Sequence, residues 1–435
     1  MSHFSRLQRN LLFIGCTMLA LLLAGVVALQ GTLNTHAAGG ILFVGHSSGL
    51  DTGCASPGFT SIQAAVDAAH TGNEVYLCGN VPYAQQVIIT KAITLTGDRG
   101  ATLVAPAAFS APDLTRWPAQ FTRDNLFVPQ VLVLVWGAGA NARITNLTIS
   151  GVMPGNGSCA ENEFGVLVIA GGTVTLSGDQ IKDIRDNNST LYGCQFGNGV
   201  QIGRESWPVT NFSTDTTEKF IGHATIVNTM VSGYQKDGIV VDGPGSTAFI
   251  SNNTVTGAGR DTSLAPIIAQ NGIQISRGAS AQIVSNQVKG NSYTGQAYAS
   301  SSGILVYGGC GDPLVTGALV TNNTLVNNDV GIYLNNYNSA CSAPAPTVTN
   351  DLASYNTIRN DAVSNVGDGT SSGFDYKGYQ AGIDDIGNTD RIIHNTISSV
   401  GYTPVQSTPG GPFVKPIDIT SFATIKPVVA FNTIR

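Results

Sequence analysis

Four aspartates near the C-terminus form the densest group of candidate catalytic residues in this sequence. Asp384, Asp385 and Asp390 lie in the segment GIDDIGNTDR, and Asp418 follows in FVKPIDIT. Paired carboxyl groups serve as acid and base in glycoside hydrolysis, whereas clustered carboxylates supply the oxygen ligands that Ca²⁺ prefers. The pattern predicts either a catalytic group of Asp384, Asp385 and Asp418 or a Ca²⁺ site of Asp384, Asp385 and Asp390.

A recurring Asn indicates how these residues would be positioned. It returns at intervals of 33, 37, 33, 39 and 37 residues, each time followed by Thr or Gln and then an aliphatic residue: Asn253, Asn286, Asn323, Asn356, Asn395 and Asn432. A repeat of this length is typical of a solenoid or a propeller. Apolar residues alternate at period two within each repeat, which predicts short strands and excludes helical repeats.

Stacked coils explain the repeat better than propeller blades, because no blade signature is visible. If each repeat is one coil, equivalent residues lie roughly 4.8 Å apart along the axis. The Asn side chains then bond to the copies above and below them, and Ile239, Ile273, Ile304 and Ile332 form one inward stack. The sequence therefore predicts a single all-β domain of about 10–12 parallel coils.

The segment GCASPGFTSIQAAVDAAHTGNEVYLCGNVPYAQQVIITKAITLTGDRGATL resembles the start of many right-handed parallel β-helix repeat proteins of the pectin-lyase-like superfamily. The resemblance extends from about residue 41 to the C-terminus. The same segment predicts a short amphipathic helix, with Thr60 and Gln63 as a capping box, inside an N-terminal cap at about 41–80. The resemblance implies a single-stranded right-handed β-helix that contacts polysaccharide.

In enzymes of that superfamily, the active site lies on the outer face of one parallel sheet. The strand that begins at each repeat's Gly is the candidate here, and its outward positions are mostly apolar or neutral in early coils but gather Tyr and Asp in later ones. Aromatic rings can stack on sugars, although Tyr is also common in strands for structural reasons alone. The expected substrate-binding residues are Tyr307, Tyr333, Asp242, Gln274 and Arg277.

Asp385 falls in an inward column that is otherwise aliphatic, where neighbouring repeats carry Leu334 and Ile419. A buried, unpaired carboxylate is costly. Either the strand bulges so that Ile386 takes the inward place, or a cation or another partner holds Asp385.

The catalytic signatures of known enzymes in the superfamily do not match this chain. Polygalacturonase-like hydrolases carry Asn-Thr-Asp, Asp-Asp, Gly-His-Gly and Arg-Ile-Lys on successive coils. Here Asp384-Asp385 precedes Asn388-Thr389-Asp390, and the last two motifs are missing. Three functions stay open: a carbohydrate-binding surface protein, a divergent polysaccharide lyase or glycoside hydrolase, and a structural envelope protein. The roles of two insertions, 105–130 and 203–222, stay open as well.

The N-terminus indicates export. Arg6 and Arg9 precede an uncharged run of 19 residues at 11–29. This pattern predicts an export signal over 1–37, or else a retained membrane anchor, ahead of a β-helix domain at 38–435. Without 1–37 the chain holds 19 Lys and Arg against 27 Asp and Glu, a net charge of −8 that argues against nucleic acid as a partner. We expect a monomer, secreted or anchored at the cell surface.

Six cysteines follow residue 37, and an even number in an exported chain suggests disulfides, although six allow 15 connectivities. The repeat places two pairs in equivalent turns of successive coils, and the third pair flanks the capping helix. We expect neighbour pairing rather than metal ligation, because no CxxC or His cluster is present. The expected pairs are Cys54–Cys78, Cys159–Cys194 and Cys310–Cys341.

Overall fold

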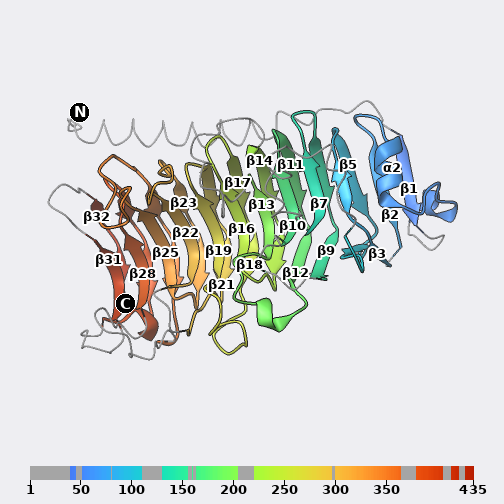
Figure 1. The fold of residues 1–435 in the computed structure, drawn as a ribbon. Coiled ribbons are helices and arrows are strands. Elements are labelled where there is room, and N and C mark those ends of the chain that lie inside the picture. The colour runs from blue at the N-terminus through green and yellow to red at the C-terminus, as the bar shows by residue number, and fades with distance from the viewer. Residues whose placement is uncertain are drawn as a thin grey trace, which may run out of the picture. The chain divides into compact units, whose positions relative to one another are not determined.

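The computed structural model describes the chain from residue 40 onward with several gaps (Figure 1). The described residues are 40–45, 51–79, 81–109, 130–154, 159, 163–203, 220–295, 299–363, 379–404, 413–420 and 427–435. The predicted export signal at 1–37, with its apolar run at 11–29, lies outside them, as do most of the two insertions. Within the described ranges, no helix is long and apolar enough to cross a membrane.

The strands of residues 41–435 form three parallel sheets, which the chain visits in turn. The first sheet contains β1 (Ile41–Gly45), β2 (Glu74–Cys78), β5 (Ile93–Gly97), β8 (Asn141–Thr145), β11 (Gly172–Ser177), β14 (Gly222–Val227), β17 (Thr247–Ser251), β20 (Ser280–Val284), β23 (Leu319–Thr321), β26 (Leu352–Ser354), β29 (Arg391–Ile393) and β32 (Val428–Ala430). The second contains β4 (Val87–Ile89), β7 (Gln130–Trp136), β10 (Glu163–Ile169), β13 (Asn198–Ile202), β16 (Asp237–Asp242), β19 (Asn271–Ser276), β22 (Ser302–Gly308), β25 (Val330–Asn336), β28 (Tyr379–Asp385) and β31 (Phe413–Ile419). The third contains β3 (Pro82–Ala84), β6 (Thr102–Val104), β9 (Thr148–Met153), β12 (Gln180–Asp186), β15 (Met230–Ser232), β18 (Thr254–Thr256), β21 (Gln287–Lys289), β24 (Thr324–Val326), β27 (Thr357–Arg359), β30 (Thr396–Ser398) and β33 (Thr433–Ile434).

Sheets of 12, 10 and 11 strands confirm the predicted stack of parallel coils. The described helical elements are short: η1 (Thr52–Ala55), α2 (Ile62–Ala68), η2 (Ser189–Leu191) and η5 (Val400–Tyr402). The fold is therefore an all-β parallel β-helix.

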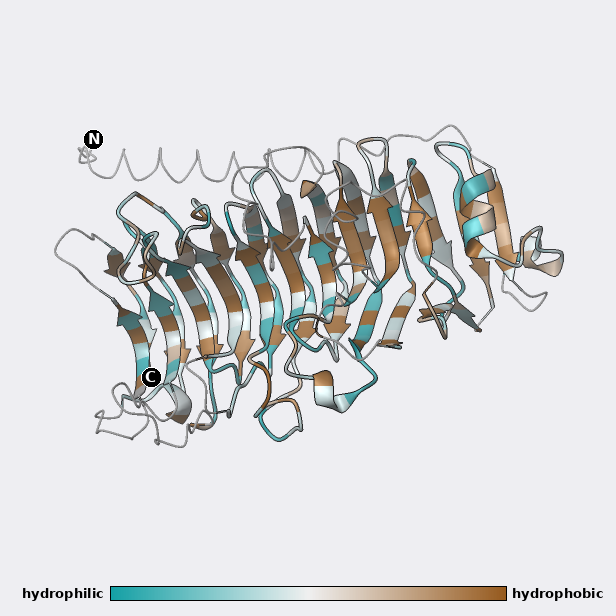
Figure 2. Ribbon diagram, viewed as in Figure 1, coloured by the Kyte–Doolittle hydropathy of each residue, from teal (hydrophilic) through white to brown (hydrophobic). Residues whose placement is uncertain are grey.

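The core is a set of aliphatic stacks that run from coil to coil. The predicted stack is confirmed, because Ile239, Ile273, Ile304 and Ile332 pair in register on β16, β19, β22 and β25 and are fully buried. Figure 2 shows hydrophobic segments recurring at corresponding levels on neighbouring strands. Period-two alternation fixes this register, since a slip of one residue would turn every inward side chain outward.

The recurring Asn forms the predicted ladder between the first and third sheets. The backbone N and the Nδ2 of Asn286 both donate to Oδ1 of Asn323, at 2.9 and 3.1 Å. Asn323 repeats both bonds to Asn356, at 2.9 and 3.1 Å. The ladder satisfies buried amides in each turn, which is a structural role.

The helix α2 covers the first coil with Ile62, Ala65 and Val66 buried. The predicted capping box at Thr60 is wrong by one residue, because the N-cap is Ser61, whose side chain accepts from the N of Ala64 at 3.3 Å. The capping amide of Ile62 instead donates to Oε1 of Gln85 at 2.9 Å, a residue that lies far along the chain.

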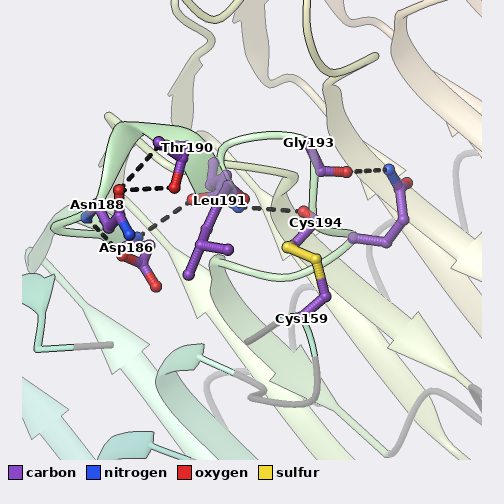
Figure 3. Close-up of a disulfide and its surroundings, with 9 residues drawn as sticks. Cys159, Asp186, Asn188, Thr190, Leu191, Gly193 and Cys194 are labelled. Carbon is purple, nitrogen blue, oxygen red and sulfur yellow. Dashed lines mark hydrogen bonds between the residues drawn. A yellow bond between two sulfur atoms is a disulfide. The ribbon is translucent and has the colours of Figure 1, made fainter. Parts of the chain in front are cut away.

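The three predicted disulfides are confirmed: Cys54–Cys78, Cys159–Cys194 and Cys310–Cys341. Figure 3 shows Cys159 joined to Cys194, which follows the short helix η2. That turn is held by hydrogen bonds from Thr190 N to Asn188 Oδ1, at 3.1 Å, and from Cys194 N to Leu191 O, at 2.9 Å. Disulfides of this kind persist in oxidising compartments.

Candidate functional site

The second sheet places the predicted outward residues in continuous columns. One column runs through Gln274, Leu305, Tyr333, Asp384 and Asp418, each paired in register with the next. The outer face of the late coils therefore gathers Tyr and Asp from strands that are far apart in sequence.

A second outward column lies beside the first. It runs through Asp242, Ser276, Tyr307 and Asn335, again in register on consecutive strands. Together the two columns bring Tyr307, Tyr333, Asp242 and Gln274 onto one face, as the sequence predicts.

Asp384 and Asp385 point to opposite sides of β28. Asp385 pairs with Leu334 on one side and Ile419 on the other, with no register shift between Ile383 and Asp385. The predicted bulge is wrong, because Ile386 continues the same register and donates its N to the O of Leu334 at 2.8 Å. Asp385 therefore occupies the inward column, only 1% exposed.

The outward carboxyls, Asp384 and Asp418, form what we call the outer carboxyl pair. Oδ2 of Asp384 accepts a hydrogen bond from the hydroxyl of Tyr379, and Nζ of Lys415 donates to Oδ1 of Asp418 at 2.6 Å. Oδ1 of Asp384 has no hydrogen-bond partner among the described residues. Asp384 is 3% exposed, whereas the side chain of Asp418 is 15% exposed.

Asp384 is a carboxylic acid that stays protonated near neutral pH. Burial raises its pKa to about 8, and the neighbouring charges of Asp418 and Asp385 act in the same direction. The Tyr379 hydroxyl and Lys415 oppose the shift but do not outweigh burial. A neutral carboxyl can donate a hydrogen bond or a proton, which an ionised one cannot.

Three tyrosines surround this acid. Burial raises the pKa values of Tyr333 and Tyr379 well above the ordinary range, and the charge of Asp384 adds to the effect. Tyr337 hydrogen-bonds to Tyr333. The three phenols therefore stay neutral and offer hydroxyl groups and ring surface on the face that carries Asp384.

The inward Asp385 belongs to a different group, the inner carboxyl cluster, made of Asp351, Asp385 and Asp390. Asp351 accepts from the N of Ala318 and from Nδ2 of Asn336, both at 2.8 Å. All three carboxyls are buried, with at most 1% of each residue exposed. They lie where the chain passes from β28 to the first sheet, at a corner of the coil interior.

Hydrogen bonds from neighbouring groups hold Asp390 and Asp385. Oδ1 of Asp390 accepts from the Thr349 hydroxyl at 2.6 Å and from the N of Asp351 at 2.7 Å. Oδ1 of Asp385 accepts from the N of Gly387 at 2.8 Å.

Asp385 and Asp390 share a proton. Among the described residues, no nitrogen or hydroxyl group donates to their remaining oxygens, while the two carboxyls bond to each other. A bond between two carboxyls requires a proton on one of them. Burial, followed by mutual repulsion, raises the pKa values of Asp351 and Asp390, and burial raises that of Asp385.

The expected Ca²⁺ ligands are thus divided between two groups, with Asp384 outside and Asp385 and Asp390 inside. Within the described ranges, no group of three or more His, Cys, Asp or Glu side chains is arranged to hold a metal ion.

Arg277 lies at the turn after β19, bound to two carboxylates. Its NH1 is 3.0 Å from Oδ1 of Asp242, and its Nε is 3.2 Å from Oδ2 of Asp312. Its guanidinium carbon lies 5.7 Å from the ring centroid of Tyr307. The hydroxyl of Ser276 also donates to Asp242 at 2.5 Å and accepts from Gln274 at 3.0 Å. The five expected substrate-binding residues therefore share one outer face.

Sequence reasoning missed Tyr379, Tyr337 and Lys415. The sequence did hold a signal for Lys415, because this residue lies three positions before Asp418 and can form an ion pair with it. Tyr379 begins the same strand as Asp384, but nothing in the repeat pattern marks it.

The family comparison agrees with the fold. The model described as "Right handed beta helix region" matches residues 131–352, which is just over half of the 435 residues. The chain belongs to the right-handed β-helix family. No curated protein matches it.

Solved structures with similar folds include enzymes and an adhesin. A lacto-N-biosidase from Eubacterium ramulus is 12% identical, with a TM-score of 0.47, and covers 94% of this chain and 70% of its own. A polygalacturonase from Erwinia carotovora is 13% identical, with a TM-score of 0.36 and coverages of 92% and 97%. PfbA, a surface adhesin of Streptococcus pneumoniae, is 12% identical, with a TM-score of 0.39 and coverages of 86% and 88%. Likeness at this level concerns the fold alone.

Proposed function

We propose that the outer face of the second sheet, from β16 to β31, binds a polysaccharide. The observation that carries the proposal is the neutral acid Asp384, which lies among Tyr333, Tyr337 and Tyr379 on an outward face. Tyrosine supplies an apolar ring with a polar tip, so it can stack on a sugar ring and hydrogen-bond to its hydroxyls. Successive coils repeat such groups about every 4.8 Å, which suits an extended polymer.

Polysaccharide hydrolysis is the second candidate, favoured by one observation. The pKa of Asp384 is raised to about 8 beside Asp418, which is held in an ion pair with Lys415 at 2.6 Å. Glycosidases use one protonated carboxyl as general acid and one ionised carboxyl as base or nucleophile. In this scheme Asp384 would protonate the leaving oxygen, and Asp418 would act from the neighbouring coil.

The proposed location is outside the cell or at its surface. The three disulfides fit an oxidising compartment, and the sequence pattern at 1–37 supports export. Peptide mapping of the mature protein would test this, because detection of the peptide at 11–29 would show that the segment is retained as an anchor.

A glycan array combined with depolymerisation assays tests the function. The informative variants are Asp384→Asn and Tyr333→Ala, and Asp261→Asn is a matched control because its side chain is 92% exposed. We expect Asp384→Asn and Tyr333→Ala each to weaken binding at least tenfold, while Asp261→Asn leaves it unchanged. Any bond cleavage should fall roughly 10²–10⁴-fold in Asp384→Asn, the range for a lost general acid. Unchanged binding in both site variants would rule out this face.

A further inference from the structure

The cations of the candidate face are already engaged by carboxylates. Among the described residues of its two columns and adjoining turns, the bases are Arg277 and Lys415. Arg277 is bound by Asp242 and Asp312, at 3.0 and 3.2 Å, and Lys415 is bound by Asp418, at 2.6 Å. Lys236, at the edge of this face, donates to the carbonyl of Ala269 at 2.5 Å.

Carboxyl groups also outnumber these bases. Asp237, Asp242 and Asp312 lie on the early side of the face, and Asp418 lies on the late side, whereas the protonated Asp384 adds no charge. Recognition of a carboxylate normally uses an Arg or Lys with donors to spare, and Arg is preferred because two parallel hydrogen bonds can form. An incoming carboxylate would instead meet a negative field at a site whose cations are occupied.

Two polar atoms on this face have no hydrogen-bond partner among the described residues. Asn335, next to Tyr307 in register, has a buried Oδ1 without a hydrogen bond in the described part of the chain, and so does Oδ1 of Asp384. The amide oxygen can accept from a sugar hydroxyl, and the neutral carboxyl can donate or accept. Buried groups of this kind cost free energy while unpaired, so a ligand that pairs with them is favoured.

We infer that this face selects an uncharged polysaccharide over a polyuronate, because Arg277 and Lys415 are ion-paired while Asn335 and Asp384 hold oxygens without hydrogen-bond partners among the described residues. This inference rests on the proposed glycan-binding function. Hydroxyl groups would bond to Asn335, Asp384 and the tyrosines, whereas a polymer with a carboxylate on each sugar would be repelled by the acidic columns.

Homogalacturonan provides a matched pair of probes. Its fully methyl-esterified form is uncharged, and its de-esterified form carries a carboxylate on each sugar of the same backbone. Titration calorimetry at low salt would compare these two polymers, with β-glucan and galactan as further neutral probes and alginate as a further polyuronate. We expect the tightest neutral polymer to bind at least tenfold more tightly than either polyuronate.

A charge variant sharpens the test. Asp242→Asn combined with Asp312→Asn would release Arg277, and we expect polyuronate binding to rise at least threefold. Lys415→Gln serves as a second variant, since a lysine that recognised uronates would lose polyuronate binding on substitution, and we expect no such loss.

The outcomes separate the inference from the function on which it rests. Tighter binding of de-esterified homogalacturonan or alginate by the parent would overturn the inference while supporting glycan binding. Absence of binding to every neutral and charged polymer would overturn the proposed function itself.

Discussion

Asp384 and Asp385 are neighbours in the chain but belong to two carboxyl groups with different surroundings. Asp385 points inward, where it bonds to Asp390 and lies near Asp351, and where backbone and hydroxyl groups donate hydrogen bonds to these carboxyls. Asp384 points outward, among tyrosines and beside Asp418. Burial raises the pKa values of both, so a shifted pKa alone does not distinguish a functional acid from a structural one.

The two groups differ in the surroundings of the second oxygen of each carboxyl group. In the inner carboxyl cluster, the second oxygens of Asp385 and Asp390 are joined by the bond between the two carboxyls. In the outer carboxyl pair, Oδ1 of Asp384 has no hydrogen-bond partner within the described ranges and lies on the face that carries the tyrosines. The inner cluster should therefore govern stability, and the outer pair should govern binding.

The largest effect on stability is expected from Asp390→Ala. The substitution leaves the buried N of Asp351 without its acceptor, which lies at 2.7 Å in the parent, while the hydroxyl of Thr349 keeps the carbonyl of Asn388 at 2.8 Å. The buried N–H without its acceptor should cost roughly 2 kcal/mol. Scanning calorimetry would show a clear drop in Tm, whereas Asp384→Ala, which loses only the bond from Tyr379, should show a much smaller one. Equal drops would erase the contrast between the two groups.

The raised pKa values of the inner carboxyls, like that of Asp384, predict a pH dependence of stability. The folded pKa values of the inner carboxyls lie above their unfolded values, so folding favours the protonated forms. Their stabilisation is complete below about pH 4, the unfolded value, and is lost as pH rises through the raised folded values. We therefore expect Tm to fall from pH 4 towards alkaline pH.

Asp385→Asn should flatten that profile. The amide Nδ2 can donate to Asp390 without a shared proton, so this variant should gain about 1 kcal/mol over the parent at pH 8 and nothing at pH 4. Melting curves across this range would measure the gain. A profile parallel to that of the parent would show that the shared proton does not contribute.

The smallest effect is expected from Asp418→Asn. Its ion pair with Lys415 is partly exposed, with side-chain exposures of 15% and 42%, so the loss should stay below about 1 kcal/mol. High salt should reduce the difference further. A loss as large as that of Asp390→Ala would make the outer pair structural as well.

The sequence predicts the columns and the disulfides because both follow from the repeat. Equivalent residues of successive coils stack, so Tyr333 and Asp384 could be aligned by counting from each Gly, Asp418 by the aliphatic residues on either side of it, and Cys310 and Cys341 by counting from each strand end. The sequence alone left two positions open for Asp385, because a one-residue bulge and a straight strand have the same composition. Only the hydrogen-bonded register decides between them.

The partners contributed by connecting turns were not predictable. Asp351 and Asp390 reach Asp385 from turns of unequal length, and the path of such a turn is not set by the period-two pattern of the strands. The same reason hides Gln85, which caps the amide of Ile62 from a distant segment.

The most direct test is a pair of single substitutions at adjacent positions, Asp384→Asn and Asp385→Asn. Binding of methyl-esterified homogalacturonan, β-glucan and galactan would be measured by calorimetry, and Tm would be measured at pH 5 and pH 8. We predict that Asp384→Asn weakens binding of the tightest polymer at least tenfold, and that Asp385→Asn leaves binding within twofold while raising Tm only at pH 8. Equal binding losses in both variants, or a loss in Asp385→Asn alone, would contradict the assignment of binding to the outer face.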